Sequence, residues 1–176
     1  TLETVKKCYK LNIPISFDVN YREQLWSPKE ARETIDKIRS YSSIFKLGHD
    51  EAELIWDKGI SPSEYAEFFY KNNVVVITDN GNPTTVYDGS NLISIDNIPI
   101  DMVDPVGAGD AFMAGFIQGI LSTNKNLKEI FLLSKKDKEK IFKNAVEIGN
   151  ICGALTCTGK GDTSSMPTIE DVNAYL

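Results

Sequence analysis

The stretch Asp104-Pro-Val-Gly-Ala-Gly-Asp110 runs directly into the apolar segment 111–121, and it decides how the chain is interpreted. Two glycines flank one alanine, so side chains do not screen the backbone N–H groups at 107–109. The pattern predicts a helix that begins here. The free N–H groups and positive dipole end of such a helix attract an anion. Asp110 falls in the first turn, where the same field favours its ionised form.

An ionised carboxylate beside an anion loop suits the transfer of a phosphoryl group to an alcohol. The carboxylate can take the hydroxyl proton while the N–H groups hold the phosphoryl charge. The alternative is a tight turn followed by an acidic first-turn residue. Other phosphate motifs fit less well, because 107–112 lacks the third glycine of a dinucleotide fingerprint and no P-loop occurs. We therefore interpret the chain as part of a kinase.

Helix and strand patterns alternate along the chain. Strands are predicted at 13–17, 44–47, 74–78, 84–88 and 92–95, and helices at 1–10, 28–40, 51–56, 62–70, 109–122, 127–133, 138–155 and after 168. This alternation predicts a three-layer α/β/α fold, with a mostly parallel sheet that helices cover on both faces. We expect one domain over residues 1–176, with the anion loop at the carboxyl end of the sheet.

Composition excludes several classes of function. The net charge is −6 and no Lys/Arg run is dense enough to follow a phosphate backbone, so nucleic acid is not expected as a partner. There is no long apolar stretch and no signal-peptide pattern, so a cytoplasmic protein without membrane contact is expected. The single histidine excludes multi-histidine metal sites, and the three cysteines indicate reduced thiols. The lysine run 135–140 is interpreted as a solvated loop or helix start.

Segment 104–110 resembles the second signature of the ribokinase-like (PfkB) sugar kinases, Asp-Thr-x-Gly-Ala-Gly-Asp, and departs from it only at Pro105. The resemblance implies that Asp110 is the base that deprotonates the sugar hydroxyl. It implies that three backbone N–H groups hold the charge of the transferred phosphoryl, those of Gly107, Ala108 and Gly109. It also implies that Asp104 helps ligate a monovalent cation such as K⁺.

The segment 18–26 follows a predicted strand and places polar side chains at alternate positions. By itself it is also typical of a strand exit rich in Asp and Asn. It resembles the Asp-x-Asn-x-Arg-x-x-Leu-Trp segment of fructokinases and 2-keto-3-deoxygluconate kinases. This resemblance implies that Asn20 and Arg22 face the cleft between sugar and nucleotide phosphates, where the planar fork of arginine matches phosphate oxygens.

The segment 48–53 aligns with the Asn-x-x-Glu segment of the same family. The resemblance implies that Glu51 helps to organise the Mg²⁺ shell, indirectly through water. Gly48 stands where asparagine is usual. An acidic helix start explains these residues equally well.

The segment 74–83 takes the place of the family's Thr-Leu-Gly-x-x-Gly nucleotide loop. Thr78 is retained and is therefore expected to contact the nucleotide. Asn80 and Pro83 stand where glycines are usual. Asparagine can adopt the left-handed backbone region but proline cannot, so the turn must be rebuilt.

The tail 150–168 contains Cys-Gly-Ala-Leu-Thr-x-Thr-x-Lys-Gly and then Met-Pro-Thr. Its small residues either leave room for an adenine ring or allow close helix packing. The tail resembles fructokinases more closely than ketodeoxygluconate kinases, and this decides the ranking between the two sugars. The resemblance implies that Asn150 and Gly153 form part of the adenosine wall.

The resemblance covers essentially the whole chain, but only the carboxy-terminal half or so of a family member. It implies an ATP-dependent fructokinase that uses Mg²⁺ and a monovalent cation, with sugar and ATP as its small-molecule partners. The amino-terminal part and β-lid would be missing, which would leave this fragment inactive, and that lid is where a homodimer could form. The alternatives are a 2-keto-3-deoxygluconate kinase or another sugar or nucleoside kinase. A non-catalytic nucleotide-binding module is the alternative from another class.

Overall fold

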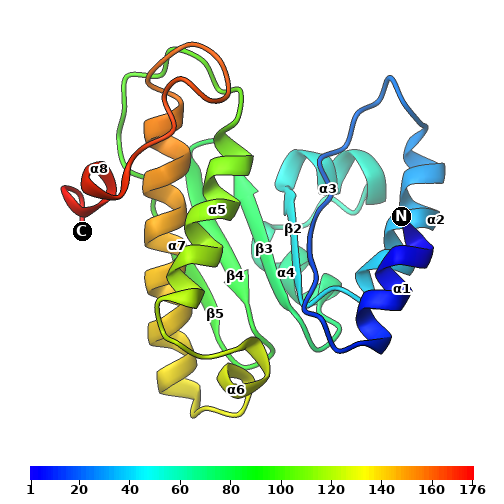
Figure 1. Ribbon diagram of the computed structural model, residues 1–176. Helices are drawn as coiled ribbons and strands as arrows, with labels where there is room; N and C mark the ends of the chain where they lie inside the picture. Colours follow the sequence, from blue (N-terminus) through cyan, green and yellow to red (C-terminus); the bar gives the residue numbers. More distant parts are fainter. The chain divides into compact units, whose positions relative to one another are not determined.

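The computed structural model describes residues 1–176, the whole chain. The chain divides into two compact units, residues 1–94 and residues 95–176 (Figure 1). The single α/β domain expected over residues 1–176 stays a prediction.

The first unit is built on a sheet whose strands follow the order β1-β2-β3-β4-β5. The strands are β1 (Ser16–Asp18), β2 (Ile44–Gly48), β3 (Val74–Asp79), β4 (Asn82–Tyr87) and β5 (Leu92–Ile95), the last of which runs into the second unit. β1, β2 and β3 are parallel, whereas β3 and β4 are antiparallel. The carboxyl ends of the three parallel strands therefore meet at one edge, where such folds place their ligand sites.

Four helices belong to the first unit: α1 (Leu2–Lys10), α2 (Pro28–Arg39), α3 (His49–Trp56) and α4 (Pro62–Phe69). The predicted starts of α2 and α4 are confirmed. Ser27 and Ser61 each accept a hydrogen bond from the backbone N–H three residues later, and a proline opens each helix. Each such cap stabilises its helix by about 1 kcal/mol.

One hydrophobic core holds the first unit together. Helices α2, α3 and α4 pack their apolar sides against one face of β2 and β3, which contributes Phe45, Leu47, Val75 and Ile77. All four strand side chains are fully buried, and burial of each stabilises the fold by about 1.5–3 kcal/mol. This packing fixes the strand ends from which the polar residues of the candidate site project.

The second unit consists of α5 (Ala108–Leu121), α6 (Leu127–Phe131), α7 (Lys135–Thr156) and α8 (Ile169–Asn173). α5 and α7 pack closely because small residues line their contact. A Cβ atom placed on Gly119 would lie 2.6 Å from the Cα atom of Ala145, and one on Gly115 would lie 2.7 Å from the Cys152 sulfur. Since larger side chains would separate the helices, the small-residue pattern sets their spacing.

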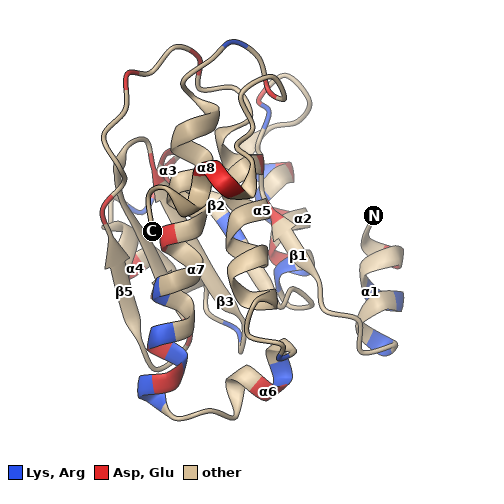
Figure 2. Ribbon diagram, turned by 60° about the vertical axis from the view of Figure 1, so that its left-hand side comes forward, with Lys and Arg blue, Asp and Glu red and all other residues tan.

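Helix α7 begins three residues earlier than predicted, because Ser134 caps it by accepting a hydrogen bond from the Asp137 N–H. The lysine run is therefore a helix start, one of the two interpretations the sequence left open. Figure 2 shows its lysines interleaved with acidic residues along the first turns of α7. Among the eight helices, none has both the length and the apolar character needed to cross a membrane.

Candidate active site

The loop 104–110, called here the α5 loop, contains a glycine, Gly107, that no other residue could replace without strain. Gly107 precedes the first residue of α5 and has φ 85°, a left-handed conformation that L-residues disfavour. A Cβ atom at this position would also lie 2.9 Å from both the Cα atom and the carbonyl oxygen of Asp162. The turn therefore needs glycine for its backbone angle and for its contact.

Three of the six backbone N–H groups of the α5 loop are unused within the chain. Those of Gly107, Gly109 and Asp110 donate to no group of the protein. The Ala108 N–H instead donates to the Pro105 carbonyl at 3.3 Å. The N–H groups without an acceptor therefore differ from the predicted three. The Ala108 N–H is used in a turn, and the Asp110 N–H is free in its place. Free N–H groups at a helix start can hold an anion.

Asp110 is the third residue of α5 and is exposed. Its carboxylate makes no hydrogen bond and no ion pair within the chain. A base that must accept a proton from a separate hydroxyl needs such an uncommitted oxygen. The assignment of Asp110 as that base stays a prediction.

Asp104 holds the α5 loop against the segment that follows α7. Its Oδ1 accepts a hydrogen bond from the Val106 N–H at 3.1 Å and its Oδ2 from the Gly161 N–H at 3.0 Å. These two bonds and the positive charge of Lys160 lower the pKa of the carboxyl. Each oxygen keeps a second lone pair, so the residue also fits the predicted contact with a monovalent cation.

The two α7 residues predicted to line the adenosine wall are both buried in the second unit. The Asn150 side chain donates to the carbonyls of Ile95 and Asp96 at 3.3 and 3.2 Å. A Cβ atom on Gly153 would lie 3.1 Å from the Ala108 carbonyl oxygen. Of the two interpretations of these small residues, the packing favours close contact between helices. Their nucleotide role stays a prediction.

In the first unit, Glu51 joins two strand exits. Its Oε1 accepts a hydrogen bond from the Tyr21 N–H at 2.5 Å, and its Oε2 accepts one from the Gly48 N–H at 2.7 Å. Burial raises the pKa of this carboxyl, and the two bonds oppose that effect. Since each oxygen already accepts an amide and keeps one lone pair, contact through a water of hydrated Mg²⁺ fits the residue.

Segment 18–22, called here the β1 exit segment, carries the two predicted phosphate or sugar contacts. Asn20 and Arg22 are both exposed, and Asn20 has φ 41° in the left-handed region. The Arg22 Nη1 group donates to the Tyr21 carbonyl at 3.0 Å. This leaves further guanidinium N–H groups for a ligand.

Thr78 lies at the end of β3 opposite Gly48 of β2, is half-buried and makes no side-chain hydrogen bond. The nucleotide loop expected after it is instead a tight hairpin turn. Asn80 and Gly81 have φ values of 40° and 91°, and β4 starts at the next residue. Pro83 therefore lies within a strand rather than in a loop.

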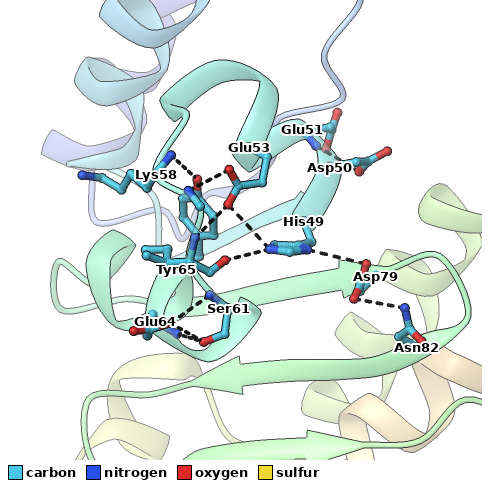
Figure 3. Close-up of polar contacts among 12 residues, drawn as sticks. His49, Asp50, Glu51, Glu53, Lys58, Ser61, Glu64, Tyr65, Asp79 and Asn82 are labelled. Carbon is cyan, nitrogen blue, oxygen red and sulfur yellow. Dashed lines mark hydrogen bonds and ion pairs between the residues drawn. The ribbon is translucent and has the colours of Figure 1, made fainter.

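His49 is placed between two acidic residues at the start of α3 (Figure 3). Its Nε2 lies 2.9 Å from the Ile60 carbonyl oxygen and 3.9 Å from Glu53 Oε1. Its Nδ1 lies 3.8 Å from Asp79 Oδ1 at the hairpin turn. The side chain thus connects α3 to the end of β3.

Sequence reasoning missed one charged residue of this region, Lys46. It lies in the middle of β2, is buried, and its Nζ is 2.9 Å from Asp18 Oδ2. The signal was available, because a lysine between Phe45 and Leu47 interrupts an apolar run that was predicted to be a strand. Lysine is almost never buried without a partner.

The residues predicted for the site thus form two groups. The second unit brings the α5 loop together with Gly161 and Asp162. The first unit brings the β1 exit segment together with Glu51 and Lys46. Asn150 and Gly153 take part in packing within the second unit.

Comparison with known proteins gives a consistent result. The sequence matches the family described as pfkB family carbohydrate kinase over residues 1–169. The "Probable fructokinase-2" of Arabidopsis thaliana is 30% identical over 165 residues, which cover 92% of this chain and 47% of that protein. The chain therefore spans about half the length of this relative.

Solved structures agree on the fold. Aminoimidazole riboside kinase of Salmonella enterica, solved with its riboside and an ATP analogue, has a TM-score of 0.79 at 23% identity and covers 99% of this chain and 56% of its own. A double-mutant fructokinase of Vibrio cholerae, solved with fructose, ADP and a potassium ion, has a TM-score of 0.78 at 23% identity, with 99% and 54% covered. The predicted ribokinase-like α/β fold class is confirmed.

Proposed function

Because this chain belongs to the pfkB family of carbohydrate kinases, we propose that it carries the phosphoryl-transfer residues of an ATP-dependent sugar kinase whose acceptor is fructose. The observation that carries the proposal is the α5 loop. Three N–H groups without acceptors begin a helix, and the uncommitted carboxylate of Asp110 lies in its first turn. The fructokinase relatives support the choice of sugar.

In the proposed mechanism, Asp110 accepts the proton of a primary hydroxyl as that oxygen bonds to the terminal phosphorus of ATP and ADP leaves. The free N–H groups of the α5 loop bind the oxygens of the transferring phosphoryl and hold the charge that it carries. The glycines at 107 and 109 keep this surface open. Asn20 and Arg22 contact the sugar and the nucleotide phosphates, and Thr78 contacts the nucleotide.

The proposed cofactors are Mg²⁺ and a monovalent cation. Glu51 would hold the first through water, and Asp104 would contact the second beside the α5 loop. Bound Mg²⁺ would supply positive charge that offsets the negative charge of the phosphate oxygens. The Vibrio cholerae fructokinase, solved with a potassium ion, supports K⁺ as the monovalent cation.

The test is ADP release by the full-length protein, supplied with ATP and Mg²⁺, over a panel of acceptors. Fructose, ribose, 2-keto-3-deoxygluconate and two nucleosides cover the alternatives. We expect the highest kcat/KM with fructose. A higher kcat/KM with 2-keto-3-deoxygluconate would show that the sugar acid, not fructose, is the substrate. Tight ATP binding without turnover on any acceptor would show that the protein is a nucleotide-binding module and not a kinase.

A further inference from the structure

Lys46 is a buried cation whose charge has one close partner. Its side chain is 8% exposed, and its Nζ donates to Asp18 Oδ2 at 2.9 Å. The other oxygen of Asp18, Oδ1, is buried and has no hydrogen-bond partner. The position of the Asp18 carboxylate therefore depends on Lys46.

This ion pair lies where the β1 exit segment leaves the sheet. Lys46 stands opposite Asp18 in the parallel register, and its carbonyl accepts the Val19 N–H at 3.0 Å. The backbone hydrogen bonds between β1 and β2 end at Val19, and Asn20 then turns the chain with its left-handed conformation. The next attachment is the Tyr21 N–H on Glu51. Two side chains, Lys46 and Glu51, thus hold the segment on both sides of Asn20.

The balance of charge around Asp18 and Glu51 also depends on Lys46. Asp18 and Glu51 are both partly buried, and the ammonium of Lys46 forms an ion pair with Asp18. Removing Lys46 would leave two partly buried carboxylates without a compensating cation, and buried charges are costly when unpaired. The segment would then move toward water.

We propose that Lys46 is a positioning residue for phosphoryl transfer, because its ion pair with Asp18 fixes the segment that presents Arg22. The proposal rests on the kinase function proposed above. Lys46 acts through the position of Arg22. Its Nζ is committed to Asp18 and its side chain is buried, so contact with substrate is not required.

A double-mutant cycle on kcat/KM tests this in the full-length protein. We expect Lys46→Met to lower kcat/KM by about 10–100-fold, the usual cost of a misplaced contact group. In a protein that already carries Arg22→Ala, the same change should cost less than about threefold. Losses that multiply in the double variant would mean that Lys46 does not act through Arg22. Lys46→Arg keeps the charge and should recover most of the activity.

A paired variant separates position from simple stability. Asp18→Asn combined with Lys46→Met removes both charges, so no buried charge is left alone. We expect its melting temperature to return toward that of the wild type while kcat/KM stays low. Recovery of both quantities together would show that Lys46 serves stability only.

Amide hydrogen exchange tests the attachment without any turnover. Exchange at residues 19–22 should quicken in the paired variant and stay unchanged in Lys58→Met, whose ammonium contacts the Phe68 ring instead. Unchanged exchange in the paired variant would overturn the proposal. If the wild type phosphorylates no acceptor, the proposed function fails, and the exchange result still decides whether Lys46 holds the segment.

Discussion

The carboxylate of Asp104 accepts a hydrogen bond from the backbone N–H of Gly161, 57 residues further along the chain, at 3.0 Å. Its other oxygen accepts the Val106 N–H, and the Asp104 N–H donates to the Cys157 carbonyl. The loop before α5 is therefore attached to the segment after α7. This attachment sets the position from which the free N–H groups of the α5 loop project.

Asp104→Ala should lower the melting temperature at neutral pH, because two N–H groups lose their acceptor. The folded pKa of Asp104 lies below its ordinary value. The stability that it contributes is therefore present above the unfolded pKa and is lost as pH falls through the folded pKa. The difference in melting temperature between wild type and variant should shrink over that acidic range. Asp101→Ala is the control, because Asp101 is an exposed acid without such bonds. A melting-temperature difference between wild type and Asp104→Ala that stays constant with pH would contradict the lowered pKa of Asp104.

Gly107→Ala should destabilise the protein by about 1–3 kcal/mol or more, because the left-handed backbone and the contact with Asp162 both oppose a Cβ atom. Gly81→Ala is the matched control, since Gly81 has φ 91° but no atom within 4 Å of the added Cβ. Urea unfolding gives both free energies. Equal losses in the two variants would show that the contact with Asp162 has no energetic weight.

Glu51→Gln should change the pH dependence of stability. The folded pKa of Glu51 is raised by burial, so its contribution is fully present below the unfolded pKa and is lost as pH rises through the folded pKa. Wild type should therefore lose stability relative to the variant as pH rises through that range. Melting temperatures of both proteins, measured without divalent metal, test this. If the melting temperature of the wild type rose relative to that of Glu51→Gln with increasing pH, the pKa of Glu51 would not be raised in the folded protein.

Asn150→Ala should lower the free energy of unfolding by about 1–3 kcal/mol, because the carbonyls of Ile95 and Asp96 lose a buried donor. Asn144→Ala, on the same helix and without a side-chain hydrogen bond, serves as the control. Denaturant unfolding compares the two variants. Similar losses would mean that the Asn150 contacts contribute little. A separate rise in the KM for ATP would support the adenosine-wall prediction.

Most elements could be predicted from local patterns. Ser27 and Ser61 fixed two helix starts because capping acts within one turn. Strand β1 is shorter at its start than expected, since it begins only after Pro14, which lacks an N–H group for the ladder. The hairpin at Asn80-Gly81 was missed because likeness to a family loop outweighed the turn preference of these two residues.

The site was less predictable, because its contacts join residues far apart in sequence. The pattern around Gly107 indicated the anion loop, yet it could not show that a turn uses the Ala108 N–H. The ion pair of Lys46 with Asp18 depends on the register of two strands, which no local pattern specifies. The burial of Asn150 likewise depends on packing that forms only in the folded chain.

Asp110 is the general base of the proposed mechanism, and Asp110→Asn in the full-length protein tests that role most directly. The substitution keeps size and shape but removes the proton acceptor. We predict that kcat falls by about 10²–10⁴-fold, the usual size of a general-base effect, while ATP and sugar binding measured by calorimetry stay within a few-fold. A variant that turns over within a few-fold of wild type would contradict the account.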